Sequence, residues 1–209
     1  MSAQPRPSNV LTLREALPIA EAAGYALGSF SPRYLAMLRP TLQAAEAARS
    51  PIIAQIAGTE FRHYGVTPAA FAEEFYRQLV ALGITVPVVL HLDHTKDLAA
   101  IAAGFTSVMS DASELPLAEN IAQTRAVVAL ARRHGVSVEA ELGRISSTDT
   151  IESGESGDDA ELYTIPRRRG ASSRRPGWMR WPSRWGRRTA SISSRSRRSI
   201  SRASLPSAP

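Results

Sequence analysis

The stretch PVVLHLDHTKDLAAIAAGFTSVMSDASELPLAENIAQTRAVVALARRHGVSVEAELGRI, Pro87–Ile145, alternates short apolar runs with a longer amphipathic segment. Three apolar runs in or overlapping this stretch predict strands, at Val86–Leu92, Thr106–Met109 and Val136–Leu142. Between the last two, Ala118–His134 carries apolar residues at spacings of three and four, which predicts a helix. Strands that alternate with helices are typical of βα units and of a parallel sheet.

The same alternation continues toward the amino terminus. Gly24–Phe30 and Pro51–Ile56 are predicted strands, and Leu35–Ala48 and Pro68–Leu82 are predicted helices. Several strands are almost continuous in Val, Ile and Leu, which indicates burial on both faces, as in a barrel or a doubly wound sheet. The expected fold class is therefore α/β.

Ionisable side chains gather where the predicted strands end. One strand runs into His91-Leu92-Asp93-His94, the next into Ser110-Asp111, and the last carries Glu139 and Glu141. In parallel α/β folds the chemistry collects at such strand ends, and imidazole with carboxylate suits a divalent metal beside a proton-transfer group. From these residues alone, His94 is a candidate ligand and Asp93 a candidate acid or base. The alternative, that these side chains only cap and hydrogen-bond neighbouring loops, stays open.

Four motifs in order, LHLDH, GFTSVMSDAS, PLAENI and HGVSVEAELG, make this stretch similar to the class II, metal-dependent ketose-bisphosphate aldolases. A looser resemblance covers residues 11–164. It implies a (β/α)8 TIM barrel, incomplete here, with about five of eight βα units. The implied reaction is zinc-dependent cleavage of a ketose 1,6-bisphosphate, of fructose or tagatose, to dihydroxyacetone phosphate and an aldehyde. The implied partner is the small sugar bisphosphate, and intact relatives are expected to be homo-oligomers.

The resemblance also implies roles for particular residues. Asp93 matches the carboxylate that exchanges the proton of the substrate's C4 hydroxyl, and His94 matches the first zinc-binding histidine. Asp111 and Glu141 match carboxylates that hold a second or displaced metal position in some members. For these last two, hydrogen bonding at the strand ends is an equally good interpretation.

Composition divides the chain into segments of different character. A polar segment, residues 1–10, precedes the aldolase-like part, 11–164, and the last segment is 165–209. That last segment holds 13 of the 25 basic residues, all as Arg, with 11 Ser, all three Trp and none of the 19 acidic residues. Such a composition predicts a disordered tail without a packed core.

Localisation has to be inferred from what the sequence lacks. The chain has no Cys, so it offers no disulfides or thiolate metal sites. Residues 1–9 lack the apolar stretch of a secretory signal, and no apolar run approaches the ~18 residues of a membrane span. A cytoplasmic protein without membrane contact is expected.

The tail begins where family members continue toward their second zinc histidine. Arg, Ser, Pro and Trp in excess are what GC-rich coding DNA yields in a wrong frame. Back-reading from the codons of Trp178, Trp181 and Trp185 restores Asp, Ala and Gly at the family's spacing. The hypothesis is a one-base deletion before the Ile165 codon, which leaves a truncated and inactive aldolase copy.

Other interpretations of the chain remain. A small α/β domain with an Arg-rich, nucleic-acid-binding tail is the main alternative, although the absence of Lys from the tail argues against nucleic acid as a partner. A non-catalytic paralogue has no positive support. Three further departures from the family lie upstream of the tail. The loops at Gly28–Arg33 and Gln55–Ala57 lack the Asn and Ser that the family usually has there. Only nine residues separate His94 from Gly104, which predicts a shortened helix, and Ser110 places a hydroxyl at an expected core position.

Overall fold

The structure is a computed structural model, and it describes residues 6–95 and 98–142. The predictions for 165–209, including the disordered tail and the shifted reading frame, lie outside the described residues. So does the boundary proposed at residue 164.

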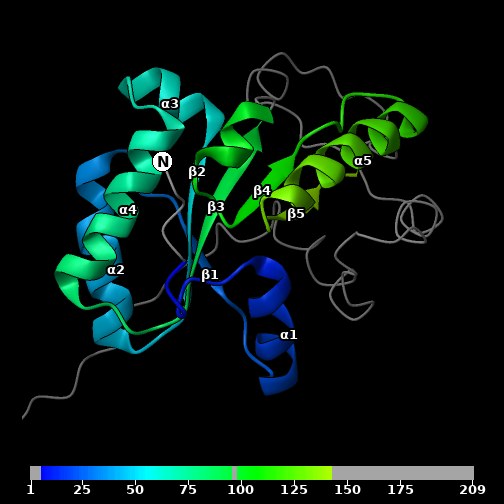
Figure 1. The fold of residues 1–209 in the computed structure, drawn as a ribbon. Coiled ribbons are helices and arrows are strands. Elements are labelled where there is room, and N and C mark those ends of the chain that lie inside the picture. The colour runs from blue at the N-terminus through cyan, green and yellow to red at the C-terminus, as the bar shows by residue number, and fades with distance from the viewer. Residues whose placement is uncertain (1–5, 96–97, 143–209) are drawn as a thin grey trace, which may run out of the picture. The chain divides into compact units, whose positions relative to one another are not determined.

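Five parallel strands form one sheet in the order β1-β2-β3-β4-β5 (Figure 1). Their bounds are β1 Gly28–Phe30, β2 Ile52–Ala57, β3 Val88–Thr95, β4 Ser107–Ser110 and β5 Ser137–Ala140. Each strand pairs with the next along the chain, so the order never reverses as it does in a doubly wound sheet. The α/β prediction is confirmed, and the winding is that of a barrel. Within the described residues, β1 and β5 each have one strand neighbour, which leaves the sheet open.

Helices connect the strands. Their bounds are α1 Leu13–Ala23, α2 Leu35–Ala48, α3 Gly58–Tyr64, α4 Pro68–Leu82, the short 3₁₀ helix η1 Leu98–Ala103 and α5 Leu117–Arg133. η1 is the shortened segment expected between His94 and Gly104. None of the helices in the described part of the chain is long and apolar enough to cross a bilayer.

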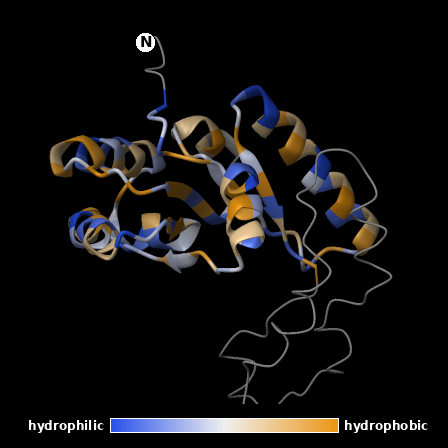
Figure 2. Cartoon of the chain, turned by 90° about the horizontal axis from the view of Figure 1, so that it is seen from below, coloured by the Kyte–Doolittle hydropathy of each residue, from blue (hydrophilic) through white to orange (hydrophobic). Residues whose placement is uncertain are grey.

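The outer face of the sheet packs against the helices and forms the main core. Alternate residues of β2, Ile52, Ala54 and Ile56, lie in one apolar cluster with Leu42 and Phe71 of α2 and α4. In Figure 2 the strands carry largely hydrophobic residues, and the surrounding helices combine hydrophobic with hydrophilic ones. The apolar face of the sheet, made by every second strand residue, thus packs against the apolar faces of the helices, made by residues at a period of 3.6.

The inner face is different because it changes from apolar to polar along the strands. At the amino-terminal end, Ile53 and Val89 pack against Leu13 and Ala16 of α1, which lies at that end in Figure 1. The next layer is polar, and the strand register places its members side by side: Gln55, His91, Ser107 and Ser137. Inward side chains of a (β/α)8 barrel stack in such layers. The polar layer leads directly to the carboxyl ends of the strands.

Several predicted bounds were wrong for local reasons. The first strand begins at Gly28 and not at Gly24, because Gly24 takes a left-handed φ of 75° and ends α1 with hydrogen bonds to α1 carbonyls. β3 continues to Thr95 instead of stopping at Leu92, and β5 stops at Ala140. α1 and α3 were not predicted.

Candidate metal and proton-transfer site

An irregularity in β3 places two consecutive residues at the site. Leu92 pairs with Val108 and Thr95 with Ser110, so Asp93 and His94 together stand opposite one residue of β4. That is a β-bulge, and His94 has a positive φ of 43°. In a regular strand, neighbours point to opposite faces. The bulge instead turns the His94 ring back toward the side that Asp93 occupies.

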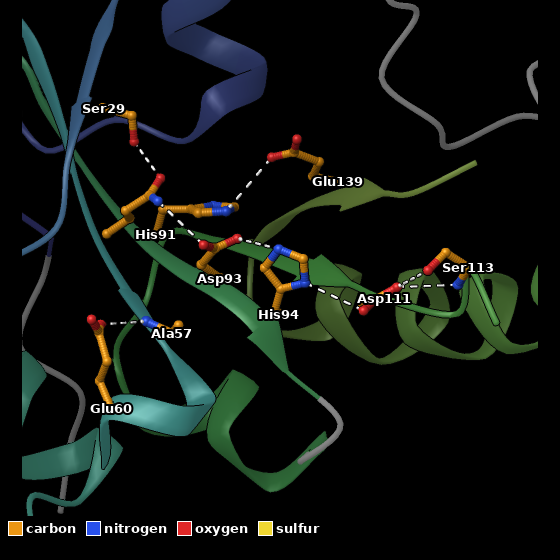
Figure 3. Close-up of polar contacts among 10 residues, drawn as sticks. Ser29, Ala57, Glu60, His91, Asp93, His94, Asp111, Ser113 and Glu139 are labelled. Carbon is orange, nitrogen blue, oxygen red and sulfur yellow. Dashed lines mark hydrogen bonds and ion pairs between the residues drawn. The ribbon is translucent and has the colours of Figure 1, made fainter. Parts of the chain in front are cut away.

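Three donors from three adjacent strands meet there. One ligand atom each of His94, Asp111 and Glu141 lies within 4.8 Å of the others. Nδ1 of His94 is 3.3 Å from Oδ2 of Asp111, and Figure 3 shows the ring between the carboxylates of Asp93 and Asp111. These residues follow or end β3, β4 and β5, so the parallel ladder brings them to one edge.

The carboxylates around His94 favour its charged form. Burial lowers the pKa of His94, but Asp93, Asp111 and Glu141 outweigh it, so the pKa lies above its usual 6.5. The pKa of Glu141 is raised, first by burial and then by the Asp111 charge. Carboxylates outnumber the imidazole at this edge, and their charges favour a cation there.

Asp111 is held in place by the turn that follows it. Burial raises its pKa, but hydrogen bonds from the Ser113 side chain and backbone and from His94 lower it overall. The Ser113 hydroxyl donates to Oδ1 at 2.7 Å and the Ser113 amide at 3.1 Å. Oδ1 is thus occupied by Ser113, and Oδ2 faces His94.

Asp93 is the carboxylate suited to carry a proton. Burial raises its pKa above the ordinary 3.8, the His94 charge opposes this, and the nearby carboxylates of Glu60 and Asp111 add to the increase. Its Oδ2 accepts a hydrogen bond from Nε2 of Gln55 at 3.2 Å, and Gln55 in turn pairs with the Ser29 hydroxyl. The backbone amide of His94 also donates to this carboxylate, and Oδ1 lies 3.8 Å from Nε2 of His94.

His91 belongs to the layer below and does not reach the cluster. Its ring is 3% exposed, with Nδ1 2.9 Å from the Ser107 hydroxyl and Nε2 3.6 Å from a Glu139 carboxylate oxygen. Burial lowers the pKa of His91 to about 4, and the His94 charge adds to this. The neutral ring therefore acts as a polar crosslink between β3, β4 and β5, and Figure 3 shows its contact with Glu139.

The structure brings together all four residues selected from the sequence, Asp93, His94, Asp111 and Glu141. Sequence reasoning missed Gln55, which donates to Asp93, and Glu60, whose charge adds to the increase in the pKa of Asp93. Gln55 is the one polar residue in the otherwise apolar run IIAQIA, and its position on the inner face could have drawn attention to it. Glu60 lies in the unpredicted helix α3, so no strand or helix pattern pointed to it.

Comparison with known proteins agrees with this geometry. Residues 11–172 match the family model described as fructose-bisphosphate aldolase class-II. The chain belongs to the class II fructose-bisphosphate aldolase family. Members of this family act as lyases and are generally metal-dependent.

Curated relatives of the aldolase family come from several bacteria. The chain is 41% identical over 146 residues to a probable fructose-bisphosphate aldolase of Bacillus subtilis, covering 67% of this chain and 50% of that protein. It is 40% identical over 145 residues to the 6-phospho-5-dehydro-2-deoxy-D-gluconate aldolase of the same organism, covering 66% and 49%. The chain thus spans about half the length of the curated relatives it matches.

Solved aldolase structures share the fold. The YdjI aldolase of Escherichia coli K12 aligns with a TM-score of 0.62 at 28% identity, over 78% of this chain and 60% of that one. Fructose-bisphosphate aldolase of Campylobacter jejuni aligns with a TM-score of 0.60 at 26% identity, over 78% and 53%.

The donor set fits the metal that the aldolase family implies. Two ligands of a tetrahedral zinc, each at its usual ~2.0–2.1 Å, lie about 3.3 Å apart. The separation of Nδ1 of His94 from Oδ2 of Asp111 is 3.3 Å, and a carboxylate oxygen of Glu141 lies within 4.8 Å of both residues' ligand atoms. One nitrogen and two carboxylate donors suit zinc and other divalent ions of similar hardness.

Proposed function

We propose that this chain supplies the amino-terminal part of a zinc-dependent aldolase that acts on a ketose 1,6-bisphosphate of the fructose or tagatose type. The observation that carries the proposal is the meeting of His94, Asp111 and Glu141 within 4.8 Å, beside a carboxyl of raised pKa on Asp93. His94, Asp111 and Glu141 would hold the metal. When bound, zinc would polarise the substrate's ketone oxygen as a Lewis acid.

Asp93 is proposed as the proton carrier of the reaction. Cleavage of the bond between C3 and C4 requires removal of the proton from the C4 hydroxyl, and condensation requires its return. A carboxyl whose pKa is raised by burial is a stronger base than an exposed one, which favours this exchange near neutral pH. Gln55 fixes the carboxylate's rotation by donating to Oδ2, so Oδ1 is the proposed atom that takes the proton.

The proposed site is incomplete in the described part of the chain. Catalytic zinc sites commonly combine several nitrogen ligands with an open position, and the described residues provide one ligand imidazole, that of His94. We therefore expect this 209-residue form to bind zinc weakly and to show no measurable aldol cleavage. The proposed cause is the shifted reading frame from Ile165 onward.

The experiment compares the chain with a gene in which one G is restored before the Ile165 codon. Zinc binding is measured by isothermal titration, and cleavage of fructose and tagatose 1,6-bisphosphate is followed in a coupled assay with added zinc. The restored form should bind zinc tightly and cleave one of the two substrates. His94→Ala in either form should abolish zinc binding, whereas His134→Ala, which changes an exposed histidine, should leave it unchanged.

Two results would contradict the proposal. Zinc binding that survives loss of His94, Asp111 and Glu141 together would place the metal elsewhere. Robust zinc-dependent turnover by the 209-residue form would show that the described residues suffice and that the frame hypothesis is wrong.

A further inference from the structure

A buried carboxamide spans the gap between two of the proposed ligand strands. Asn120 lies in the first turn of α5 and is 3% exposed. Its Nδ2 donates to the carbonyl oxygen of Ala112 at 2.9 Å and to that of Glu141 at 3.0 Å. Ala112 is the residue after Asp111, so both acceptors belong to the backbone that carries proposed ligands.

The orientation of this carboxamide is fixed by its partners. Each of its two N–H groups is used on one carbonyl, and a flipped amide would turn an oxygen toward both carbonyls. The oxygen Oδ1 accepts a hydrogen bond of 3.4 Å from the hydroxyl of Thr124, which is fully buried. Asn120 therefore has one productive arrangement.

The sheet brings the two ligand positions to one edge, but its ladder ends one residue before each of them. The last residue pair between β4 and β5 is Ser110 with Ala140, and Asp111 and Glu141 each lie one residue beyond it. Past the end of a ladder, the backbone spacing is no longer set by strand pairing. Asn120 bridges the chain at this point, where the described residues show no further strand pairing.

We propose that Asn120 is a positioning residue for the metal site, setting the spacing between the strand ends that carry Asp111 and Glu141. The inference rests on the proposed metal-binding function. It assigns a role to the PLAENI segment, in which Asn120 otherwise reads as an ordinary polar residue at a helix start. Groups that orient metal ligands typically contribute a factor of about 10 to 100 in metal affinity.

The first test measures metal binding by the full chain with Asn120→Ala and Asn120→Asp. Asn120→Asp keeps the shape but replaces two donors by an acceptor. The matched control is Gln78→Ala, because Gln78 is also a buried carboxamide on a helix, 5% exposed, but donates to Glu74 within its own helix α4. Zinc is titrated calorimetrically, and cobalt(II) serves as a spectroscopic probe of ligand geometry.

Both Asn120 variants should bind zinc about 10- to 100-fold more weakly and should change the cobalt absorption bands. Gln78→Ala should bind zinc like the wild type and should leave the cobalt absorption bands unchanged. Asn120 variants that bind both metals like the wild type, with the same cobalt spectrum, would overturn the inference while leaving the proposed function intact.

A second test needs no metal, and the chain suits it because it contains no cysteine. Asp111→Cys with Glu141→Cys creates one thiol pair, whose rate of closure by a short bis-alkylating reagent reports the spacing of the two positions. Adding Asn120→Ala should slow closure at least several-fold, whereas adding Gln78→Ala should not. If the 209-residue chain bound both metals too weakly to measure, the proposed function would still be judged on the frame-restored form, and this rate alone would decide the inference. An unchanged rate would overturn it.

Discussion

The buried ring of His91 makes the stability of this protein sensitive to mild acid. Burial lowers the pKa of this imidazole from its usual 6.5 to about 4 in the folded chain. In the unfolded chain the ring is solvated and takes up a proton near pH 6.5. Between these values the unfolded state binds more protons, so the free energy of unfolding falls as the pH falls from about 6.5 to about 4.

The size of this effect follows from the two pKa values. Each pKa unit corresponds to about 1.4 kcal/mol, so the full difference is about 3.4 kcal/mol. Between pH 7 and pH 5, His91 alone should account for a loss of about 2 kcal/mol. The ring is 3% exposed, so solvent screening reduces this loss of stability only slightly.

The measurement is urea unfolding followed by far-UV circular dichroism at pH 7 and pH 5. His91→Gln retains a polar group but cannot titrate, so its loss between the two pH values should be smaller than the wild-type loss by about 2 kcal/mol. His134→Gln removes an exposed histidine and should leave the wild-type loss unchanged. Equal losses in the wild type and in His91→Gln would refute the account of a neutral buried ring.

Three further outcomes are expected. Ser110→Ala should raise the free energy of unfolding in urea by about 1 kcal/mol, since the Ser110 hydroxyl is buried without a hydrogen-bond partner among the described residues; a destabilised variant would mean that the hydroxyl has a partner. Asp93→Asn should leave zinc affinity within about threefold while abolishing turnover in the frame-restored enzyme, because the proposed role of this carboxyl is to carry a proton and not to bind the metal. A large loss of zinc affinity would place Asp93 in the ligand set. Zinc affinity should fall by about tenfold per pH unit below the pKa of His94, which its neighbouring carboxylates raise above 6.5; a flat titration profile down to pH 5 would exclude His94 as a ligand.

The sequence predicted those elements whose residues show a regular period. The predicted bounds of two helices, Leu35–Ala48 and Pro68–Leu82, are those of the structure. Apolar residues recur in both at spacings of three and four residues, and Gly83 ends the second helix. α1 was missed although Thr12 and Glu15 form a capping box, a signal visible as Thr-x-x-Glu. α3 has only seven residues, too few to show a period.

The candidate site was predictable in its residue types but not in its geometry. The sequence shows His, Asp and Glu at the ends of successive predicted strands, and parallel pairing of the strands brings these residues to one edge of the sheet. The bulge at Asp93 and His94 is not visible, because no glycine or proline marks it and its positive φ falls on a histidine. Gln55 and Asn120 act through tertiary hydrogen bonds to residues 38 and 21 positions away, which no local pattern reveals.

The irregular pairing of β3 limits how this site could be transferred to another protein. Copying Asp, His, Asp and Glu onto the strand ends of an ideal parallel sheet would send one of the two adjacent residues, Asp93 or His94, to the opposite face. The extra residue in β3 therefore has to be grafted together with the side chains, as a backbone insertion of fixed position. A design that kept these four residues but made the strand regular would reproduce the sequence motif without bringing the four side chains together.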